Sequence, residues 1–296
     1  MKEIVLITGA NGHLAKFVSE YLKKDYEIRF LTTNKKLKKN HYYWDIKRKY
    51  LDVNSLKNCK HIIHLAGYSI LKRWTKKNKS IMYNSRIKST NLLFEKCQEI
   101  NLKPKTFICA SAMGIYKQNN QEITYENSEK GSGWVSKMAC DWEKSSNKFK
   151  EINSRVIQLR ISLIFSKAAG FLKYNLMSMK YGLGLIIGDP NKNINWIDVN
   201  DVSRFIKKCL TNHHYIGPYN LSCDENISQK KMIYLIKKKL YPYCIILKIP
   251  NFLIAPILGG RKKIINFDLK LSNEKLKKDG FKCSTNSFAT LLDKLN

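Results

Sequence analysis

The sequence lacks several features that mark whole classes of protein. Its eight cysteines, in 296 residues, form no Cys-x-x-Cys pair and no metal-ligand spacing. We therefore expect reduced, mostly buried thiols and neither a bound metal nor a disulfide framework. No apolar segment with a cleavage site follows Met1, which predicts a cytoplasmic protein without a signal peptide. The most apolar stretch, 245–258, is interrupted by Lys248, Pro250 and Pro256, which argues against a membrane span.

Acidic residues are scarce. The chain has 54 Lys and Arg against 23 Asp and Glu, for a formal net charge of +31, and only eight of the cations are Arg. Such a charge is typical of proteins that bind nucleic acid or anionic surfaces. The lysines are spread along the whole chain, however, and clusters such as 35–39 and 237–239 have no interleaved aromatic residues. We interpret them as solvated faces and expect no specific nucleic-acid partner and no membrane partner.

Strand-like and helix-like segments alternate over the first 161 residues, and no internal repeat interrupts them. The hydrophobic pattern predicts strands at 3–8, 27–32, 42–44, 62–65, 106–110 and 155–161, and helices at 14–22, 85–100 and 135–149. This alternation is typical of a doubly wound parallel sheet with right-handed crossovers. In such a fold the ligand site lies at the carboxyl ends of the strands.

The first predicted strand runs into a turn of small residues. Residues 7–15 place Gly9, Gly12 and Ala15 at Gly-x-x-Gly-x-x-Ala spacing, between a strand and a helix. Gly9 permits a tight turn, Gly12 lets the backbone approach a diphosphate, and Ala15 lets the helix pack closely on the strand. The amides at the start of the helix stabilise phosphate charge. The pattern predicts a dinucleotide site, and the alternative is an ordinary structural turn.

The end of the second predicted strand indicates which dinucleotide is bound. An Asp or Glu at this place hydrogen-bonds a ribose 2′-hydroxyl. Here the chain has Thr32, Thr33 and Asn34, followed by Lys35 and Lys36. Because an acid is lacking and cations are present, we predict that NADP(H) is favoured over NAD(H), with Thr33 among the cofactor-binding residues.

Beyond residue 165 the pattern is less regular. It predicts helices near 199–210 and 228–240, a strand near 219–221, and a terminal module of amphipathic helices from residue 250, including 271–278. We therefore predict an α/β Rossmann-fold domain over 1–225, with substrate-region insertions from about 165, and a small C-terminal helical or mixed domain over 226–296.

Short motifs along almost the whole chain resemble those of one family. They are TGANGHLA at 8–15, WD at 44–45, HLAG at 64–67, KRWT at 72–75, NSRI at 84–87, ASAMGIY at 110–116, DWE at 141–143, LR at 159–160, LG at 183–184 and NWIDVND at 195–201. In this order they are similar to TGGTGFIG, WD, NLAG, KRWT, DSRI, ASAVGYY, DWE, LR, LG and SWIHIDD. These belong to the epimerase family protein group of the extended short-chain dehydrogenase/reductase superfamily, which carries a small C-terminal domain.

The resemblance implies cofactor-binding roles for residues in three segments. It places the diphosphate at Gly9, Asn11, Gly12, His13 and Leu14, the adenine near Asp45, and the adenosine ribose along Leu65, Ala66 and Gly67. His13 stands where the group has Phe, and Ala15 where it has Gly. Asp45 has an alternative interpretation as the cap of a helix or turn.

The resemblance also shows what the chain lacks for catalysis. In the wider superfamily a Tyr, assisted by a Lys four residues later, exchanges a proton with the substrate while the nicotinamide takes or gives hydride. Aligned on the segment 141–143, these positions hold Trp134 and Met138, neither of which titrates. The related group generally has apolar residues there too.

Three polar residues remain as candidates for catalysis. Ser111 lies beside the expected Ser/Thr position, which holds Ala112. Tyr116 could supply the missing phenol, and the alternative is that it packs in the core. Arg86 could hold an anionic substrate with two parallel hydrogen bonds, and the alternative is a salt bridge between helices.

These observations support two functional hypotheses. The first is an NADP(H)-binding atypical short-chain dehydrogenase/reductase. It would act as a reductase or nucleotide-sugar-epimerase-like enzyme on a small substrate, which could be an anion. The second is a catalytically silent dinucleotide sensor or scaffold, linked to cell division. In either case we expect a cytoplasmic monomer or homodimer.

Overall fold

The computed structural model describes residues 2–118, 122–250, 252–253, 256, 259–261 and 268–295. The chain divides into two compact units. Unit 1 comprises Met1–Ile115, Ser132–Arg160 and Val202–Tyr219, and unit 2 comprises Tyr116–Gly131, Ile161–Asp201 and Asn220–Asn296. The domain boundary at residue 225 stays a prediction, and part of the predicted terminal module lies outside the described residues.

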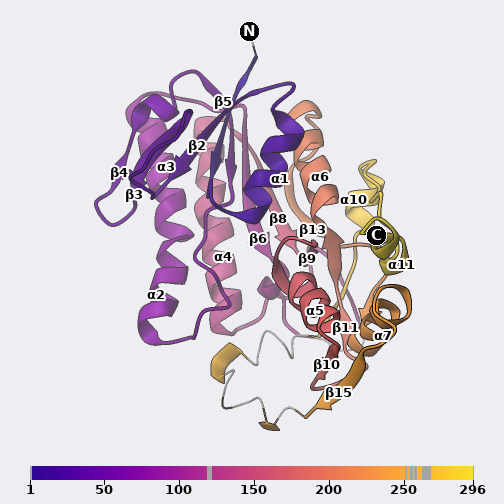
Figure 1. The fold of residues 1–296 in the computed structure, drawn as a ribbon. Coiled ribbons are helices and arrows are strands. Elements are labelled where there is room, and N and C mark those ends of the chain that lie inside the picture. The colour runs from indigo at the N-terminus through magenta and orange to yellow at the C-terminus, as the bar shows by residue number, and fades with distance from the viewer. Residues whose placement is uncertain are drawn as a thin grey trace. The chain divides into compact units, whose positions relative to one another are not determined.

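A large sheet forms the centre of unit 1 (Figure 1). Among the described residues, its eight strands follow the order β13-β8-β6-β5-β1-β2-β3-β4. The pairs β1–β2, β1–β5, β2–β3 and β5–β6 are parallel, and β3–β4 is antiparallel. The strands are β1 (Ile4–Thr8), β2 (Glu27–Thr32), β3 (His41–Asp45), β4 (Tyr50–Leu51), β5 (Cys59–His64), β6 (Thr106–Ala112), β8 (Arg155–Ile161) and β13 (Gly217–Leu221). Strand order reverses direction at β1, so the predicted doubly wound, mainly parallel sheet is confirmed.

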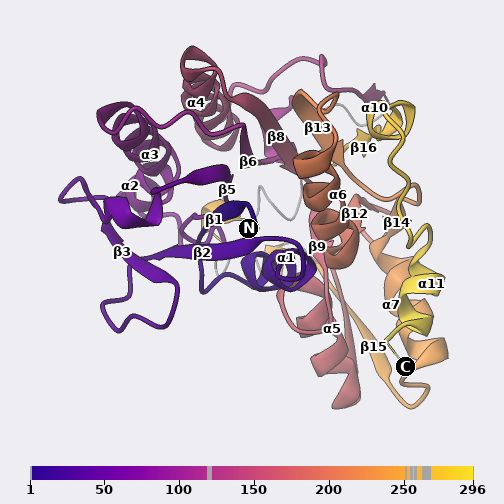
Figure 2. The same ribbon diagram turned by 90° about the horizontal axis from the view of Figure 1, so that it is seen from above.

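Helices cover both faces of this sheet. Figure 2 shows α1 and α6 on one face and α3 and α4 on the other. Their bounds, with the shorter α2, are α1 (His13–Leu22), α2 (Lys76–Asn84), α3 (Ile87–Glu99), α4 (Trp134–Asn147) and α6 (Val199–Thr211). In α1, the buried residues Ala15, Val18 and Leu22 recur at helical spacing, which gives that helix one apolar face for the sheet.

The core of unit 1 lies between the sheet and its helices. Val5, Leu6 and Ile7 of β1 are buried completely, as expected for a central parallel strand that is covered on both sides. On the α4 side, Phe107 stacks on Phe149 with ring centroids 3.6 Å apart. Leu6, Phe107 and Phe149 belong to one hydrophobic core, which holds the central strands in place.

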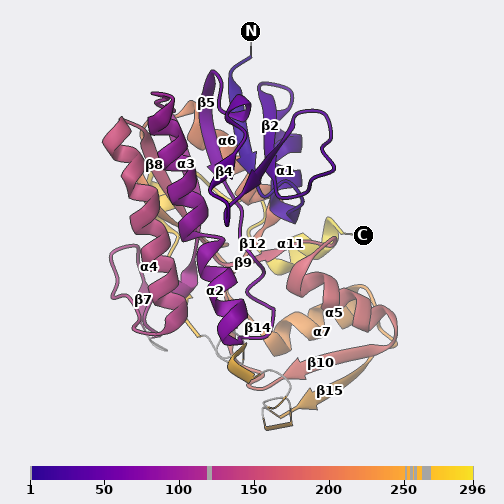
Figure 3. The same ribbon diagram turned by 90° about the vertical axis from the view of Figure 1, so that its left-hand side faces the viewer.

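Unit 2 contains shorter strands with helices beside them. Figure 3 shows α5 (Gly170–Lys180) and α7 (Gln229–Lys239) next to the parallel pair β10 (Leu183–Ile187) and β15 (Ile245–Ile249). The other elements are β7 (Ile123–Thr124), β9 (Leu163–Phe165), β11 (Asn193–Ile194), β12 (Trp196–Asp198), β14 (Ile227–Ser228), β16 (Lys270–Leu271), α10 (Glu274–Lys278) and α11 (Phe288–Asp293). Its core includes Phe165 stacked on Trp196, with centroids 5.1 Å apart.

One predicted helix is wrong at its start. The segment 271–278 was expected to be helical throughout, but Leu271 belongs to β16 and pairs with Thr124, so the helix begins only at Glu274. Several elements, among them α2, α5, β10 and β15, have no counterpart in the prediction. Among the described residues, no helix combines the length and apolar character that crossing a bilayer requires.

Candidate functional site

A cavity of about 510 Å³ lies in unit 1 at the carboxyl ends of β1, β2, β3 and β5. Eight of the residues predicted to bind the cofactor line it, namely Gly9, Asn11, Gly12, Thr33, Asp45, Leu65, Ala66 and Gly67. His13 and Leu14 lie in the first turn of α1 and are not among the lining residues. The walls also include residues that the sequence did not single out, among them Tyr43, Lys47, Tyr68, Ile81 and Ser85.

The glycine turn has no room for side chains at two positions. Gly9 adopts a φ of +76°, and a Cβ there would lie 3.1 Å from the backbone nitrogen of Ala66. The amide of Gly12 donates to the Gly9 carbonyl at 2.7 Å, and a Cβ on Gly12 would lie 2.9 Å from that oxygen. Gly12 precedes α1 without a side-chain cap, and the first turn of α1 contains no acid. The first amides of a helix lack intrahelical acceptors, so this end attracts an anion.

A buried threonine fixes the wall opposite the glycine turn. The Thr8 hydroxyl accepts hydrogen bonds from the amides of Leu65 at 3.1 Å and Ala66 at 3.0 Å. Its oxygen also lies 2.8 Å from Nδ1 of His64, and both side chains are completely buried. Thr8 therefore ties the end of β1 to the segment after β5, which holds Ala66 against Gly9.

The Thr8 contacts assign the protonation of His64. Because the hydroxyl already accepts two amides, its single proton is directed at Nδ1, and Nε2 then carries the imidazole proton toward Ser89 Oγ at 3.1 Å. Burial lowers the pKa of His64 to about 3, so the ring is neutral at physiological pH. His64 thus connects β1, β5 and α3 through the hydrogen bonds of its neutral ring.

Asp45, the last residue of β3, also lines the cavity. Its Oδ1 accepts the amides of Lys47 at 2.9 Å and Arg48 at 3.2 Å. The Arg48 amide is the largest cause of a lowered pKa for this carboxyl. The turn-capping interpretation of Asp45 therefore holds in the structure, and the residue lines the cavity as well.

The loop after β2 carries two lysines a few residues beyond the part of it that lines the cavity. The amide of Asn34 donates to Thr32 Oγ1 at 3.1 Å, and the amide of Lys36 donates to Asn34 Oδ1 at 3.0 Å. These two local bonds order the backbone that carries Lys35 and Lys36, whose side chains are exposed. Thr33 in the same loop lines the cavity.

Arg86 lies between α2 and α3, mostly buried. Its Nη1 donates to the carbonyls of Tyr68 and Met82, both at 3.0 Å, and its guanidinium carbon lies 5.1 Å from the centre of the Trp142 ring. Burial lowers the pKa of Arg86 to about 10. Among the described residues no carboxylate forms an ion pair with Arg86, so the predicted alternative of an interhelical salt bridge is absent there.

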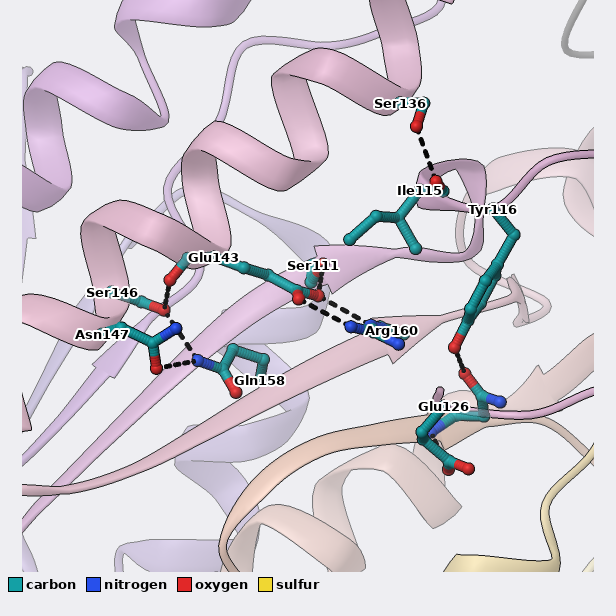
Figure 4. A network of polar contacts seen from close by, with 11 residues as sticks. Ser111, Ile115, Tyr116, Glu126, Ser136, Glu143, Ser146, Asn147, Gln158 and Arg160 are labelled. Carbon is teal, nitrogen blue, oxygen red and sulfur yellow. Dashed lines mark hydrogen bonds and ion pairs between the residues drawn. The ribbon is translucent and has the colours of Figure 1, made fainter. Parts of the chain in front are cut away.

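Ser111 belongs to a buried polar network. Figure 4 shows Glu143 of α4 between Ser111 and Arg160. The Ser111 hydroxyl donates to Glu143 Oε1 at 2.7 Å, while Arg160 donates to both carboxylate oxygens at 2.8 Å through Nε and Nη2. All three residues are at most 7% exposed. The Ser111 proton is therefore directed at Glu143.

Tyr116 is also buried, in unit 2. It is 2% exposed, and its hydroxyl donates to Asn220 Oδ1 at 2.5 Å. In unit 1, the two positions aligned with the missing Tyr and Lys lie on α4. Trp134 contacts Trp74 edge to face at 5.0 Å, and Met138 is 5% exposed. A packed apolar surface thus occupies those positions.

A larger hollow of about 960 Å³ lies at the opposite edge of the sheet, by the amino ends of β1, β2 and β5. Its wall includes Lys2, Glu3, Tyr26 and Phe30, and no glycine is among the described lining residues. The described part of its lining therefore has no glycine turn of the kind that binds a diphosphate, and ligands of doubly wound sheets bind at the other edge. Size alone does not make it the functional site.

A doubly wound sheet with a glycine turn at the strand where its order reverses defines a dinucleotide-binding α/β protein. A model of the NAD dependent epimerase/dehydratase family matches residues 5–222, and the chain belongs to this family. An epimerase family protein of Staphylococcus epidermidis is 28% identical over 297 residues, with 98% of each chain covered.

Two solved structures have a similar fold. The human epimerase family protein SDR39U1, crystallised with NADPH, gives a TM-score of 0.86 at 17% identity and covers 98% of both chains. The nucleoside-diphosphate sugar epimerase of Corynebacterium glutamicum gives 0.80 at 20% identity, over 99% of this chain and 57% of that one. The chain is accordingly an NAD(P)-binding protein of the epimerase/dehydratase family.

Proposed function

We propose that this protein uses NADP(H) as a reductase or epimerase-like oxidoreductase on a small substrate. The observation that carries the proposal is the cavity lined by the glycine turn, where Gly9 has no room for a side chain against Ala66. Thr33 forms part of its wall, and Lys35 and Lys36 follow Thr33 closely in the chain. The human relative that was crystallised with NADPH supports the choice of cofactor. Cytoplasmic location and a monomeric or dimeric state stay predictions.

The residues of the cavity fit a dinucleotide in a defined order. Gly12 and the first amides of α1 would hold the diphosphate, because these amides begin a helix that has neither a side-chain cap nor an acid in its first turn. Asp45 would lie by the adenine and Leu65 by the adenosine ribose. Lys35 and Lys36 would neutralise a 2′-phosphate. When bound, the nicotinamide accepts or delivers hydride, and the protein's task is to orient it and exclude water.

The cofactor proposal is tested by calorimetry with NADPH, NADP⁺, NADH and NAD⁺. We expect the wild-type protein to prefer NADPH to NADH by about tenfold or more, as expected for two lysines at a phosphate. The double variant Lys35→Glu/Lys36→Glu should lose that preference, whereas Lys38→Glu/Lys39→Glu, with the same charge change in the same loop, should keep it. Equal affinities of the wild-type protein for NADPH and NADH would overturn the proposal.

A specific observation favours the second hypothesis, a silent dinucleotide sensor or scaffold. Trp134 and Met138 cannot exchange protons, and the hydroxyls of Ser111 and Tyr116 donate to Glu143 and Asn220 inside the protein. We therefore regard catalysis by Ser111 or Tyr116 as the weaker part of the proposal. NADPH fluorescence that shifts on binding, with no oxidation against a broad panel of carbonyls, favours the sensor. Turnover that persists in Tyr116→Phe and disappears in Arg86→Gln favours an enzyme that depends on Arg86.

A further inference from the structure

The parallel strands β10 and β15 of unit 2 carry an aliphatic face that is open to solvent. Side chains alternate along a strand, so the residues that the register joins at every second position share one face. These pairs are Leu183 with Ile245, Leu185 with Leu247, and Ile187 with Ile249. All six are exposed or only partly buried, and Ile245 is 67% exposed.

The opposite face of the same two strands packs on helices. Ile186 is 1% exposed, and a Cβ built on Gly184 would lie 3.2 Å from Ile233 of α7 and 3.4 Å from Met179 of α5. Figure 3 shows both helices next to the strand pair. Parallel strands are usually covered on both faces. The aliphatic face therefore indicates a contact with something outside the described chain.

Exposed aromatic residues extend this face at both ends. Tyr181 and Tyr243 each precede a strand by two residues and are 82% and 62% exposed. The Tyr243 hydroxyl donates to the carbonyl of Lys180 at 2.8 Å, which joins the start of β15 to the end of α5. Beyond β15, Phe252 is 71% exposed. We call the six aliphatic residues, with Tyr181, Tyr243 and Phe252, the apolar patch.

The segments that carry the apolar patch contain cations and no acids. No Asp or Glu occurs in 152–188 or in 226–267, whereas 226–267 contains nine Lys and Arg. Lys180 and Lys248 are exposed and adjoin patch residues in the chain. A second copy of the chain would bring the same cations against these lysines. The patch is also much smaller than the roughly 20–30 residues that each side of a stable protein interface supplies.

We propose that the apolar patch binds the surface of an anionic lipid bilayer. Its aliphatic side chains would lie below the headgroups, its tyrosines at headgroup level, and Lys180 and Lys248 beside the lipid phosphates. The expectation of no membrane partner was drawn from the lack of an apolar span and from lysine clusters without aromatic residues. A contact with one leaflet needs no span, and the fold brings exposed tyrosines and lysines of two distant segments together.

The test is flotation of the full-length protein with vesicles of phosphatidylcholine and phosphatidylglycerol in equal amounts. We expect the wild-type protein to bind these mixed vesicles about tenfold or more tightly than vesicles of phosphatidylcholine alone. Ile245→Ser/Leu247→Ser should bind the mixed vesicles about tenfold or more weakly, because two aliphatic side chains no longer leave water. The matched control Leu71→Ser/Ile216→Ser changes the same two residue types, 56% and 54% exposed, in unit 1 and should bind like the wild type.

A second pair of variants tests the charge. Lys180→Gln/Lys248→Gln should weaken binding to the mixed vesicles about tenfold or more, because both lysines would contact the lipid headgroups. Lys88→Gln/Lys103→Gln makes the same change in net charge at exposed positions of unit 1 and should weaken it less than about threefold. Circular dichroism of every variant should match the wild type, since all the replaced side chains are exposed.

Three outcomes would overturn the inference. The first is a wild-type protein that does not float with the mixed vesicles, and the second is an Ile245→Ser/Leu247→Ser variant that floats as the wild type does. The third is an equal loss in the two lysine variants, which would assign vesicle binding to the net charge alone. A dimer in analytical ultracentrifugation that Ile245→Ser/Leu247→Ser converts to a monomer, without vesicle binding by the wild type, would assign the patch to a second copy.

Discussion

Replacing Thr8 by Val tests whether one hydroxyl organises the wall of the cofactor cavity. The two side chains have nearly the same shape, so the change removes the hydroxyl with little loss of volume. The Ala66 amide and Nδ1 of His64 would lose a buried partner, whereas the Leu65 amide is only partly buried and water can replace its bond. At about 1–3 kcal/mol for each of these two buried groups left unpaired, we expect a loss of about 2–6 kcal/mol in the free energy of unfolding.

Thr90→Val is the matched control for this change. Thr90 is also buried completely, but its hydroxyl only adds a bond at 2.6 Å to the Arg86 carbonyl, which already accepts the Thr90 amide at 3.1 Å. The control should therefore lose less than about 1 kcal/mol. Urea unfolding measures both changes. Thr8→Val should also weaken NADPH binding, because Ala66 is no longer held against Gly9. Equal stability losses in the two variants would mean that the Thr8 hydroxyl does not hold this wall.

Three further predictions concern other buried groups. Glu143→Gln leaves Arg160 without its charged partner and should cost about 3–5 kcal/mol in urea unfolding, and a loss below 1 kcal/mol contradicts the pairing. Burial lowers the pKa of His64 from 6.5 to about 3, so on acidification the unfolded state binds a proton that the folded state does not. The free energy of unfolding should therefore fall by about 1.5 kcal/mol between pH 6.5 and 5. The variant His64→Asn should lose this pH dependence, and a variant that keeps it contradicts the role of His64. Asp201→Ala removes the acceptor of the Thr285 amide at 3.1 Å, so hydrogen exchange at Thr285 should accelerate, and unchanged exchange contradicts this role.

Local patterns were sufficient for the elements around the cavity. The strand before Gly9 and the helix after Gly12 follow from an apolar run and from helical spacing, and β2 and β8 have the predicted bounds. Helix α2 was missed because Lys76–Asn84 is mostly polar. It is fixed instead by the Thr75 cap on the Asn78 amide and by the burial of Met82. Strand β15 depends on its pairing with β10, some sixty residues earlier, which no local pattern reveals.

The candidate site, like the fold, contains residues that the sequence predicts and contacts that it does not. The glycine turn could be predicted from small residues that follow an apolar strand, whereas Asp45 was expected from the family resemblance. Tyr43 and Lys47, which flank Asp45 at the end of β3, could have been found beside it. The partners of Ser111 and Tyr116 could not, since Glu143 and Asn220 are distant in sequence. Long-range hydrogen bonds of this kind decide whether a hydroxyl is available for chemistry, and only the folded chain shows them.

We expect the dinucleotide to lie in the cavity at the carboxyl ends of the strands. The most direct measurement is an amide NMR titration of isotope-labelled protein with NADPH. We predict the largest shifts at the amides of Gly9, Gly12 and Ala66. Largest shifts around the larger hollow at the opposite edge, at residues such as Tyr26 and Phe30, or no shifts at saturating NADPH, would contradict the account.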